Sequence, residues 1–163
     1  MGLAVLKETF GELVDYYERT DLPRHPDCLT LMQYWEACIA AGGFVVGRDI
    51  PARPIARLLR NIILVEPVND ATDFRIRLAG SMVRQRFNDE IKDRYLSELR
   101  SPEDFKHRRD AACDALRTGR PAIIDSRLRR GSVEEMHTEV ILLPVTSADR
   151  SATWLLVGIF YFG

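Results

Sequence analysis

The segment Thr153–Phe162, TWLLVGIFYF, carries apolar or aromatic side chains at almost every position. Successive side chains of a β-strand point to opposite faces of its sheet, so this strand would be apolar on both faces. Neither face could stay in water without favouring aggregation. The chain must therefore fold with a covering layer on each side of its last strand.

The elements that precede this strand indicate an α+β fold. Four further segments have strand patterns: Ile62–Val68, Phe74–Leu78, Ala122–Leu128 and Glu135–Val145. Four segments have helical patterns: Thr30–Ala41, about two turns from Pro54, Ser81–Phe87, and Pro102–Thr118 between a Ser101 cap and Gly119. Because the strands group as two and three without βαβ alternation, we predict a single five-stranded antiparallel sheet with helices on one face.

The N-terminal segment has apolar residues at spacings of three and four. They are Leu3, Leu6, Phe10, Leu13 and Tyr17. This stripe predicts an amphipathic helix that covers the second face of the sheet, in its own chain or in a second copy. We accordingly divide the chain into a helical cap and dimerisation segment, residues 1–28, and a sheet domain, residues 29–163. The five stripe residues form the predicted dimer interface.

Composition narrows the function classes. With 163 residues, a net charge of −1 and 46% hydrophobic residues, the chain suits one globular domain without a drive toward nucleic acid. No apolar run reaches the roughly 18 residues of a membrane span, and the first ten residues are too short and too soon charged for a signal peptide. Three widely spaced cysteines indicate reduced thiols. We therefore expect a cytoplasmic protein without membrane insertion.

Several stretches of the sequence resemble one protein family. They are YWEACIAAGGFVVGRDIPARPIARLLRNIILVEPV, DFRIRLAGSMVRQRF, LRTGRPAI and EVILLPV. Together they are similar to a proteobacterial subfamily of PAS domains that is often found as a stand-alone domain, over roughly Leu29 to Phe162. The resemblance implies a PAS fold, a sensory or interaction role, and dimerisation through the element that covers the outer sheet face.

PAS domains hold ligands between the inner sheet face and the helices across it, and strand alternation assigns residues to that space. The predicted lining is Phe74, Ile76, Leu78, Phe105, Ala112, Leu116, Ile124, Ser126, Thr138, Val140, Trp154 and Leu156. Small residues on the long helix leave room for a ligand, but they also suit a tightly packed core. Both interpretations remain open from the sequence.

Cofactor and catalytic motifs find no support. Ser81–Phe87 holds no cysteine of the kind that flavin photosensory PAS domains use, and His107 lies in the charged first turns of its helix, where a haem ligand is disfavoured. Spacings typical of metal ligands, phosphate loops and nucleophile elbows are missing. We predict no cofactor, no metal, no catalytic residue and no enzymatic activity.

We therefore predict a single-domain sensor or protein-interaction module in cytoplasmic signalling. It would act as a homodimer through an unidentified signalling partner, with a small apolar ligand as one option. Two alternatives stay open: a ligand-free dimeric scaffold and a small α+β enzyme. At the strand-to-helix corner after Leu78, Gly80 is expected to have a structural role, with the lip of a pocket as the alternative.

Overall fold

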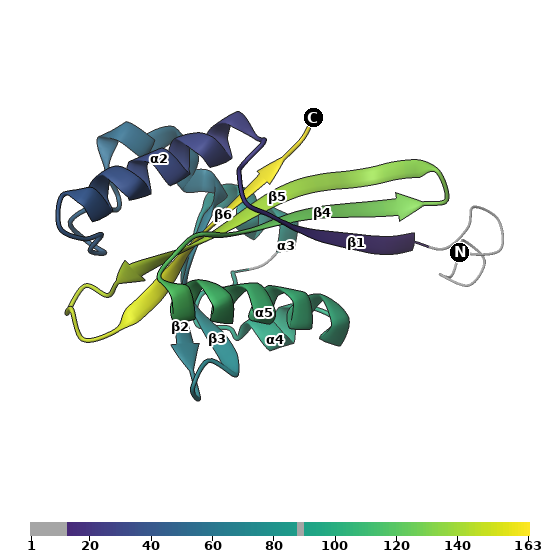
Figure 1. Ribbon diagram of the computed structural model, residues 1–163. Helices are drawn as coiled ribbons and strands as arrows, with labels where there is room; N and C mark the ends of the chain where they lie inside the picture. The colour runs from purple at the N-terminus through teal and green to yellow at the C-terminus, as the bar shows by residue number, and fades with distance from the viewer. Residues whose placement is uncertain (1–12, 88–89) are drawn as a thin grey trace.

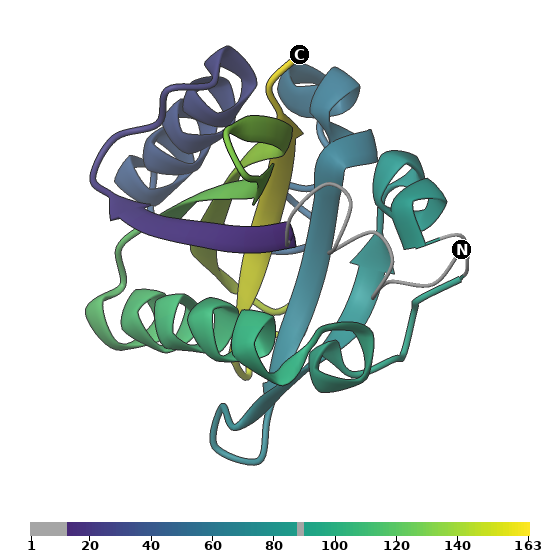
Figure 2. The same ribbon diagram turned by 90° about the vertical axis from the view of Figure 1, so that its right-hand side faces the viewer.

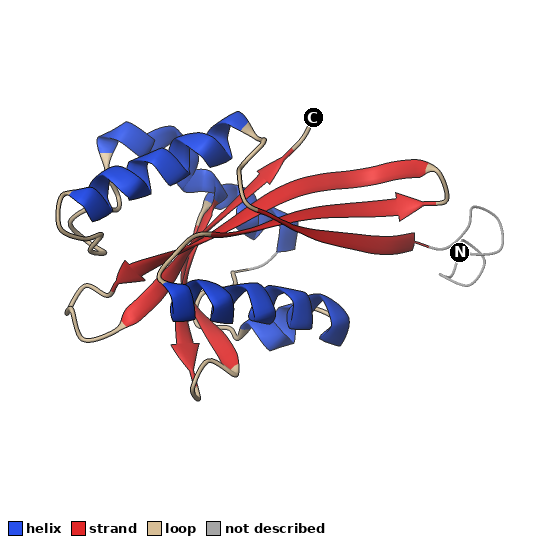
Figure 3. Cartoon of the chain, viewed as in Figure 1, coloured by secondary structure: helices blue, strands red, loops and turns tan. Residues whose placement is uncertain are grey.

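The computed structural model describes residues 13–87 and 90–163. Within them the strands form one antiparallel sheet in the order β1-β4-β5-β6-β2-β3. The strands are β1 (Leu13–Thr20), β2 (Ile62–Val68), β3 (Asp73–Ala79), β4 (Ala122–Arg130), β5 (Val133–Thr146) and β6 (Thr153–Tyr161). The helices are α2 (Pro26–Ala40), the 3-10 helix η1 (Arg53–Asn61), α3 (Ser81–Phe87), α4 (Leu96–Leu99) and α5 (Pro102–Thr118). Figure 3 separates the two element types by colour.

Helices cover both faces of the sheet. α2 lies on one side and α5 on the other, and β1 runs between them (Figures 1 and 2). β6 shows the consequence: Leu155 and Val157 belong to the core beneath α5, whereas Leu156 and Phe160 belong to the core beneath α2. The requirement that both faces of the last strand be covered is thus met.

The second face is covered by a different element from the one predicted. Leu31 and Trp35 of α2, with Ile55 and Leu58 of η1, pack on that face. Helices are therefore present on both faces rather than one. The sequence analysis missed this because α2 was assigned no face, so the N-terminal segment was left as the cover.

The N-terminal helix prediction is wrong where the structure tests it. Leu13–Thr20 is a strand that pairs with β4 along its whole length, which makes the sheet six-stranded rather than five-stranded. Leu13 and Tyr17 are four residues apart, and this spacing places two residues on one face of a strand as well as of a helix. The remaining stripe residues, Leu3, Leu6 and Phe10, lie outside the described residues.

α2 begins four residues earlier than predicted. The His25 ring accepts the Asp27 N–H at 3.1 Å, and Pro26 occupies the first turn, where its missing N–H costs nothing. Histidine is not among the usual cap residues, so the start was missed. The prediction for α5 is confirmed: Ser101 Oγ accepts the Asp104 N–H at 3.2 Å, and Gly119 ends the helix with φ 68°.

Gly80 sits where β3 passes closely over the end of η1. Its N–H donates to the Ile62 carbonyl at 2.8 Å. A Cβ at this position would lie 2.2 Å from the Leu59 carbonyl oxygen, a distance that no side chain can occupy. The glycine therefore permits a close approach between backbone segments, which is the structural role predicted for this corner.

Candidate functional site

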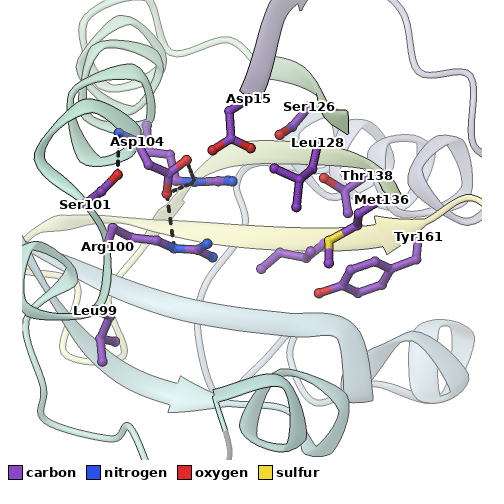
Figure 4. Close-up of a pocket in the computed structure, with 12 residues that line it drawn as sticks. Asp15, Leu99, Arg100, Ser101, Asp104, Ser126, Leu128, Met136, Thr138 and Tyr161 are labelled. Atoms are coloured by element: carbon purple, nitrogen blue, oxygen red, sulfur yellow. Dashed lines mark hydrogen bonds and ion pairs between the residues drawn. The ribbon is translucent and has the colours of Figure 1, made fainter. Parts of the chain in front are cut away.

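A cavity of about 330 Å³ opens between the start of α5 and the part of the sheet formed by β1, β4, β5 and β6 (Figure 4). Its volume falls at the lower end of the range of about 300–1,000 Å³ typical of small-molecule sites. Its lining comprises Asp15, Leu99, Arg100, Ser101, Asp104, Arg108, Ser126, Leu128, Met136, Thr138, Ile159 and Tyr161.

One face of α5 explains why the space opens at this end. The buried residues Asp104, Ala111, Ala112 and Ala115 recur at helical spacing and point to the sheet. The alanines allow the C-terminal half of the helix to lie close to the strands. Toward the N-terminal half the inward side chains become longer and polar, at Arg108 and Asp104, and the cavity lies beside them.

The Asp104 carboxylate is the meeting point of three side chains. It accepts the Tyr17 hydroxyl at 2.6 Å. Nε of Arg108 lies 3.1 Å from Oδ2, and Nε of Arg100 lies 3.4 Å from the same atom. The side chains of Asp104, Arg108 and Arg100 are only 11%, 12% and 26% exposed. One carboxylate therefore faces two guanidinium groups in a largely buried setting.

The pKa values reflect this arrangement. Burial disfavours the Asp104 carboxylate, but the charge of Arg108, the hydrogen bond from Tyr17 and the charge of Arg100 outweigh it and lower the pKa of Asp104. Burial, and then the neighbouring Arg108, lower the pKa of Arg100. Burial and the bond to Asp104 raise the pKa of Tyr17. Asp104 is thus held ionised, and the excess charge of the cluster rests on Arg100 and Arg108.

The opposite wall carries hydroxyl groups. Ser126 of β4 and Thr138 of β5 are cross-strand partners that face the cavity, and Tyr161 closes the side near the C-terminal end of β6 (Figure 4). None of these three hydroxyls makes a hydrogen bond with a described residue. The Arg86 guanidinium lies 4.1 Å from the centre of the Tyr161 ring. The site therefore combines cations on one side with neutral polar groups on the other.

The apolar space beside the cavity is almost filled. It measures about 40 Å³, close to the room that one water molecule needs. Its walls include Phe74, Ala112 and Ile124, three of the residues expected to line a ligand pocket. Ile76, Val140 and Leu116 belong to the adjoining core or pack against it. Of the twelve expected lining residues, Ser126 and Thr138 border the large cavity.

Four other expected lining residues lie elsewhere. Trp154 and Leu156 pack beneath α2 because β6 is apolar on both faces, so its alternation gave no indication of which set faced α5. A bulge between Leu64 and Val65 shifts the β2–β3 register, and Leu78 is 48% exposed on the groove beside Ile50. Phe105 is half-buried outside the α5-side core, beneath the guanidinium of Arg109.

Sequence reasoning missed the charged residues of the cavity. Ala112 was placed on the inward face of α5, and steps of four toward the N-terminus from it give Arg108 and Asp104. The signal was therefore present, but Asp104 and Arg108 were not among the residues predicted to line the pocket. A further step of four gives Arg100, but this residue lies before the Ser101 cap, outside α5, where the helical period no longer assigns a face.

A second buried polar cluster lies on the α2 side of the sheet. The Glu139 carboxylate is completely buried and accepts the backbone N–H groups of Arg24 and His25 at 2.9–3.0 Å. Its cross-strand partner Asp125, also buried, accepts from His137 at 2.9 Å and Arg127 at 3.1 Å. These hydrogen bonds are satisfied within the chain, so the cluster anchors the start of α2 and leaves no free group for a ligand.

Histidines and carboxylates do not gather into a metal centre within residues 13–87 and 90–163. The His107 ring is stacked on Tyr17 with 4.1 Å between the ring centres, and it does not line the cavity. Over the same residues, no helix has both the length and the hydrophobicity needed to cross a membrane.

The fold is an antiparallel sheet with helices on both faces and a cavity beside the start of α5. A family model described as PAS domain matches residues 23–160. The chain belongs to the PAS domain family. Searches of curated proteins and of solved structures gave no match. The match covers α2 to β6, so β1 precedes the part of the chain that the PAS model describes.

PAS domains are in general sensory or interaction modules. In this PAS domain the five strands β2 to β6 make up the sheet of the matched region, and β1 extends it beside β4. The cavity therefore has walls from both parts: α5, β4, β5 and β6 from the matched region, and Asp15 from the additional strand.

Proposed function

We propose that this PAS domain is a non-enzymatic cytoplasmic signalling module that binds a small molecule in the cavity beside α5 and transmits its presence through a partner protein. The observation that carries the proposal is the cavity of about 330 Å³ next to a core that is otherwise filled. Its polar lining favours a polar ligand over the apolar one that the sequence suggested.

A route for transmission runs from the cavity to β1. Asp104 lines the cavity and also accepts the Tyr17 hydroxyl at 2.6 Å. Farther along the same helix, Asp114 lies 3.1 Å from Arg19 of β1. A ligand that draws Arg108 or Arg100 away from Asp104 changes the electrostatic surroundings of the carboxylate to which the Tyr17 hydroxyl is bonded. The proposal thus makes β1 the element whose position depends on occupancy.

The same strand is the proposed contact with other chains. β1 pairs with β4 on one side and has no strand partner on its other side within the described residues. The opposite edge, β3, is engaged by residues 93–95, since the Ile76 N–H donates to Arg94 and the Asp93 N–H to Ile76. Open edges favour pairing with a further strand. We therefore propose that homodimers form through β1 rather than through an N-terminal helix.

The proposal is tested by native mass spectrometry of the purified protein before and after denaturation. We expect a small additional mass that is lost on denaturation. Thr138→Leu, which fills the cavity wall, should abolish the additional mass, whereas Thr153→Leu at an exposed position of β6 should retain it. If every sample shows only the mass of the chain, the ligand-binding proposal is contradicted. The ligand-free scaffold would then be favoured, and the nearly filled apolar core of the domain fits that alternative.

A further inference from the structure

We propose that the ligand of the α5 cavity is a small organic acid whose carboxylate binds Arg100 and Arg108. This inference rests on the proposed ligand-binding function and specifies the chemistry of that ligand. It was not accessible from the sequence, where an apolar ligand was the option considered.

The first argument is the charge balance of the cluster. Two guanidinium groups share the single carboxylate of Asp104, at Nε–Oδ2 distances of 3.4 Å and 3.1 Å, so among the described residues one positive charge has no buried counterion. Burial of an unbalanced charge is costly unless a partner balances it. Burial and the like charge of Arg108 also lower the pKa of Arg100, which shows that the surroundings do not favour its cationic form. A bound anion would correct this imbalance.

The terminal guanidinium nitrogens of Arg100 and Arg108 are available as hydrogen-bond donors. Both arginines contact Asp104 through Nε, and their terminal nitrogens make no hydrogen bond to any residue that the structure describes. The Arg100 guanidinium extends from beside Asp104 into the cavity, in the direction of Tyr161 (Figure 4). Its other face lies 5.1 Å from the centre of the Phe87 ring, which restricts its position. A held guanidinium with free terminal N–H groups suits bidentate recognition of a carboxylate.

Apart from Asp15 at the rim, the described residues that line the rest of the cavity are uncharged. Across from the arginines, the hydroxyls of Ser126, Thr138 and Tyr161 can accept or donate hydrogen bonds, and Met136 provides an apolar contact. This wall suits the uncharged body of a small acid. Among the described residues, none of those that line this wall is cationic, so a dianion such as phosphate would exceed the positive charge that Arg100 and Arg108 supply. Asp15, exposed at the rim, disfavours additional negative charge further.

The test compares acids with their amides, which have nearly the same shape and no charge. Thermal unfolding and titration calorimetry would be performed with acetate, propionate, benzoate and inorganic phosphate, and with acetamide, propionamide and benzamide. We expect at least one carboxylate to bind and its amide to bind at least about tenfold more weakly, the factor that one charge-assisted hydrogen bond provides. Binding of phosphate alone would overturn the carboxylate assignment.

Variants locate the binding. Arg100→Met and Arg108→Met should each weaken the acid at least about tenfold and leave any amide binding unchanged. Arg109→Met is the matched control, because Arg109 is next to Arg108 on α5, lies over the Phe105 ring and does not line the cavity. Circular dichroism and the midpoint of thermal unfolding check that each variant is folded. Arg100→Lys, which keeps the charge, should restore part of the affinity.

The outcomes separate this inference from the function on which it rests. If the purified protein carries a neutral compound, or if amides bind as well as acids, the ligand-binding function stands but the assignment of the ligand as an organic acid is wrong. An equal loss of affinity in Arg109→Met overturns the assignment to Arg100 and Arg108. If no acid of the panel binds and native mass spectrometry shows no additional mass, both proposals fail.

Discussion

Asp104 illustrates how one residue links stability to the candidate site. Its carboxylate holds Tyr17 of β1 and faces Arg108 and Arg100. Because its pKa is lower in the folded chain than the ordinary value of about 3.9, the ionised carboxylate stabilises the fold above about pH 4. That contribution is lost as the pH falls through the pKa of the folded chain.

Asp104→Asn should therefore destabilise the protein by about 2 kcal/mol at neutral pH, because it leaves the arginines without their counterion. The difference from the wild type should shrink at pH 3, because the stability that the ionised carboxylate contributes is lost progressively below about pH 4. Urea unfolding at pH 7 and pH 3 measures both values. Asp110→Asn, exposed on the same helix and without a hydrogen bond or ion pair to a described residue, is the control. A difference that does not depend on pH would contradict the role of ionisation.

Replacing either of two glycines by alanine would bring the new Cβ too close to neighbouring atoms, but the expected losses of stability differ. At Gly80 the obstacle is backbone, with the Leu59 carbonyl oxygen at 2.2 Å. At Gly158 the obstacles are the ends of the Leu31 and Phe160 side chains, each at 2.7 Å, which can rotate. Gly80→Ala should therefore destabilise by about 3 kcal/mol and Gly158→Ala by about 1 kcal/mol in urea unfolding. The reverse order would show that the corner after β3 can move.

At the scale of elements, β1 is attached to the rest of the fold by side chains as well as by strand pairing. Beyond its pairing with β4, Tyr17 bonds Asp104 and stacks on His107, and Arg19 bonds Asp114. These contacts all reach α5. We therefore expect β1 to loosen before the rest of the sheet whenever its contacts with α5 weaken.

Tyr17→Phe tests this attachment by removing one hydroxyl and nothing else. The lost bond to a buried carboxylate should cost about 1.5–3 kcal/mol and should speed hydrogen exchange across Leu13–Thr20, with little change in β5 and β6. Tyr16→Phe is the neighbouring control, since the Tyr16 side chain is exposed and its hydroxyl makes no hydrogen bond to a described residue. Faster exchange in both variants, or in neither, would remove Tyr17 from the proposed route of transmission.

The elements also show where sequence reasoning succeeded. α5 and the strands from β2 to β6 were predicted to within a few residues, because capping residues, turns and alternation mark their ends. β1 was missed because a spacing of four fits both a helix and a strand. The charged end of the cavity was missed because Arg100, Asp104 and Arg108, although they follow one another at steps of four, are of types that are usually exposed, and only the packing of α5 on the sheet encloses them.

At the scale of the whole molecule, the sheet consists of two parts. β1, β4 and β5 form one, β2 and β3 form the other, and β6 joins them by pairing with β5 and β2. In Figure 1, β1, β4 and β5 extend outward beyond the helices, and β1 is the outermost strand on this side of the described sheet.

Dimerisation through the edge of β1 predicts a mass in solution of twice the chain mass of 18.6 kDa. Val14→Lys combined with Tyr16→Lys places charges on β1, at two exposed apolar positions, and should give the monomer mass in light scattering. Leu29→Lys combined with Ile39→Lys makes the same change on exposed positions of α2 and should leave the dimer intact. A dimer that is lost only with the α2 pair would place the contact on the opposite side of the molecule.

The central position of β6 has a consequence for biosynthesis. β6 is the last strand of the described sheet to be synthesised, yet it supplies the only strand pairing between the two parts of that sheet. Until Thr153–Tyr161 leaves the ribosome, β5 and β2 both present unpaired edges, and the apolar residues beneath α2 and α5 lack their middle strand. The sheet therefore cannot close before β6 has left the ribosome, and a ribosome stalled a few residues short of β6 would hold a product that chaperones recognise as unfolded.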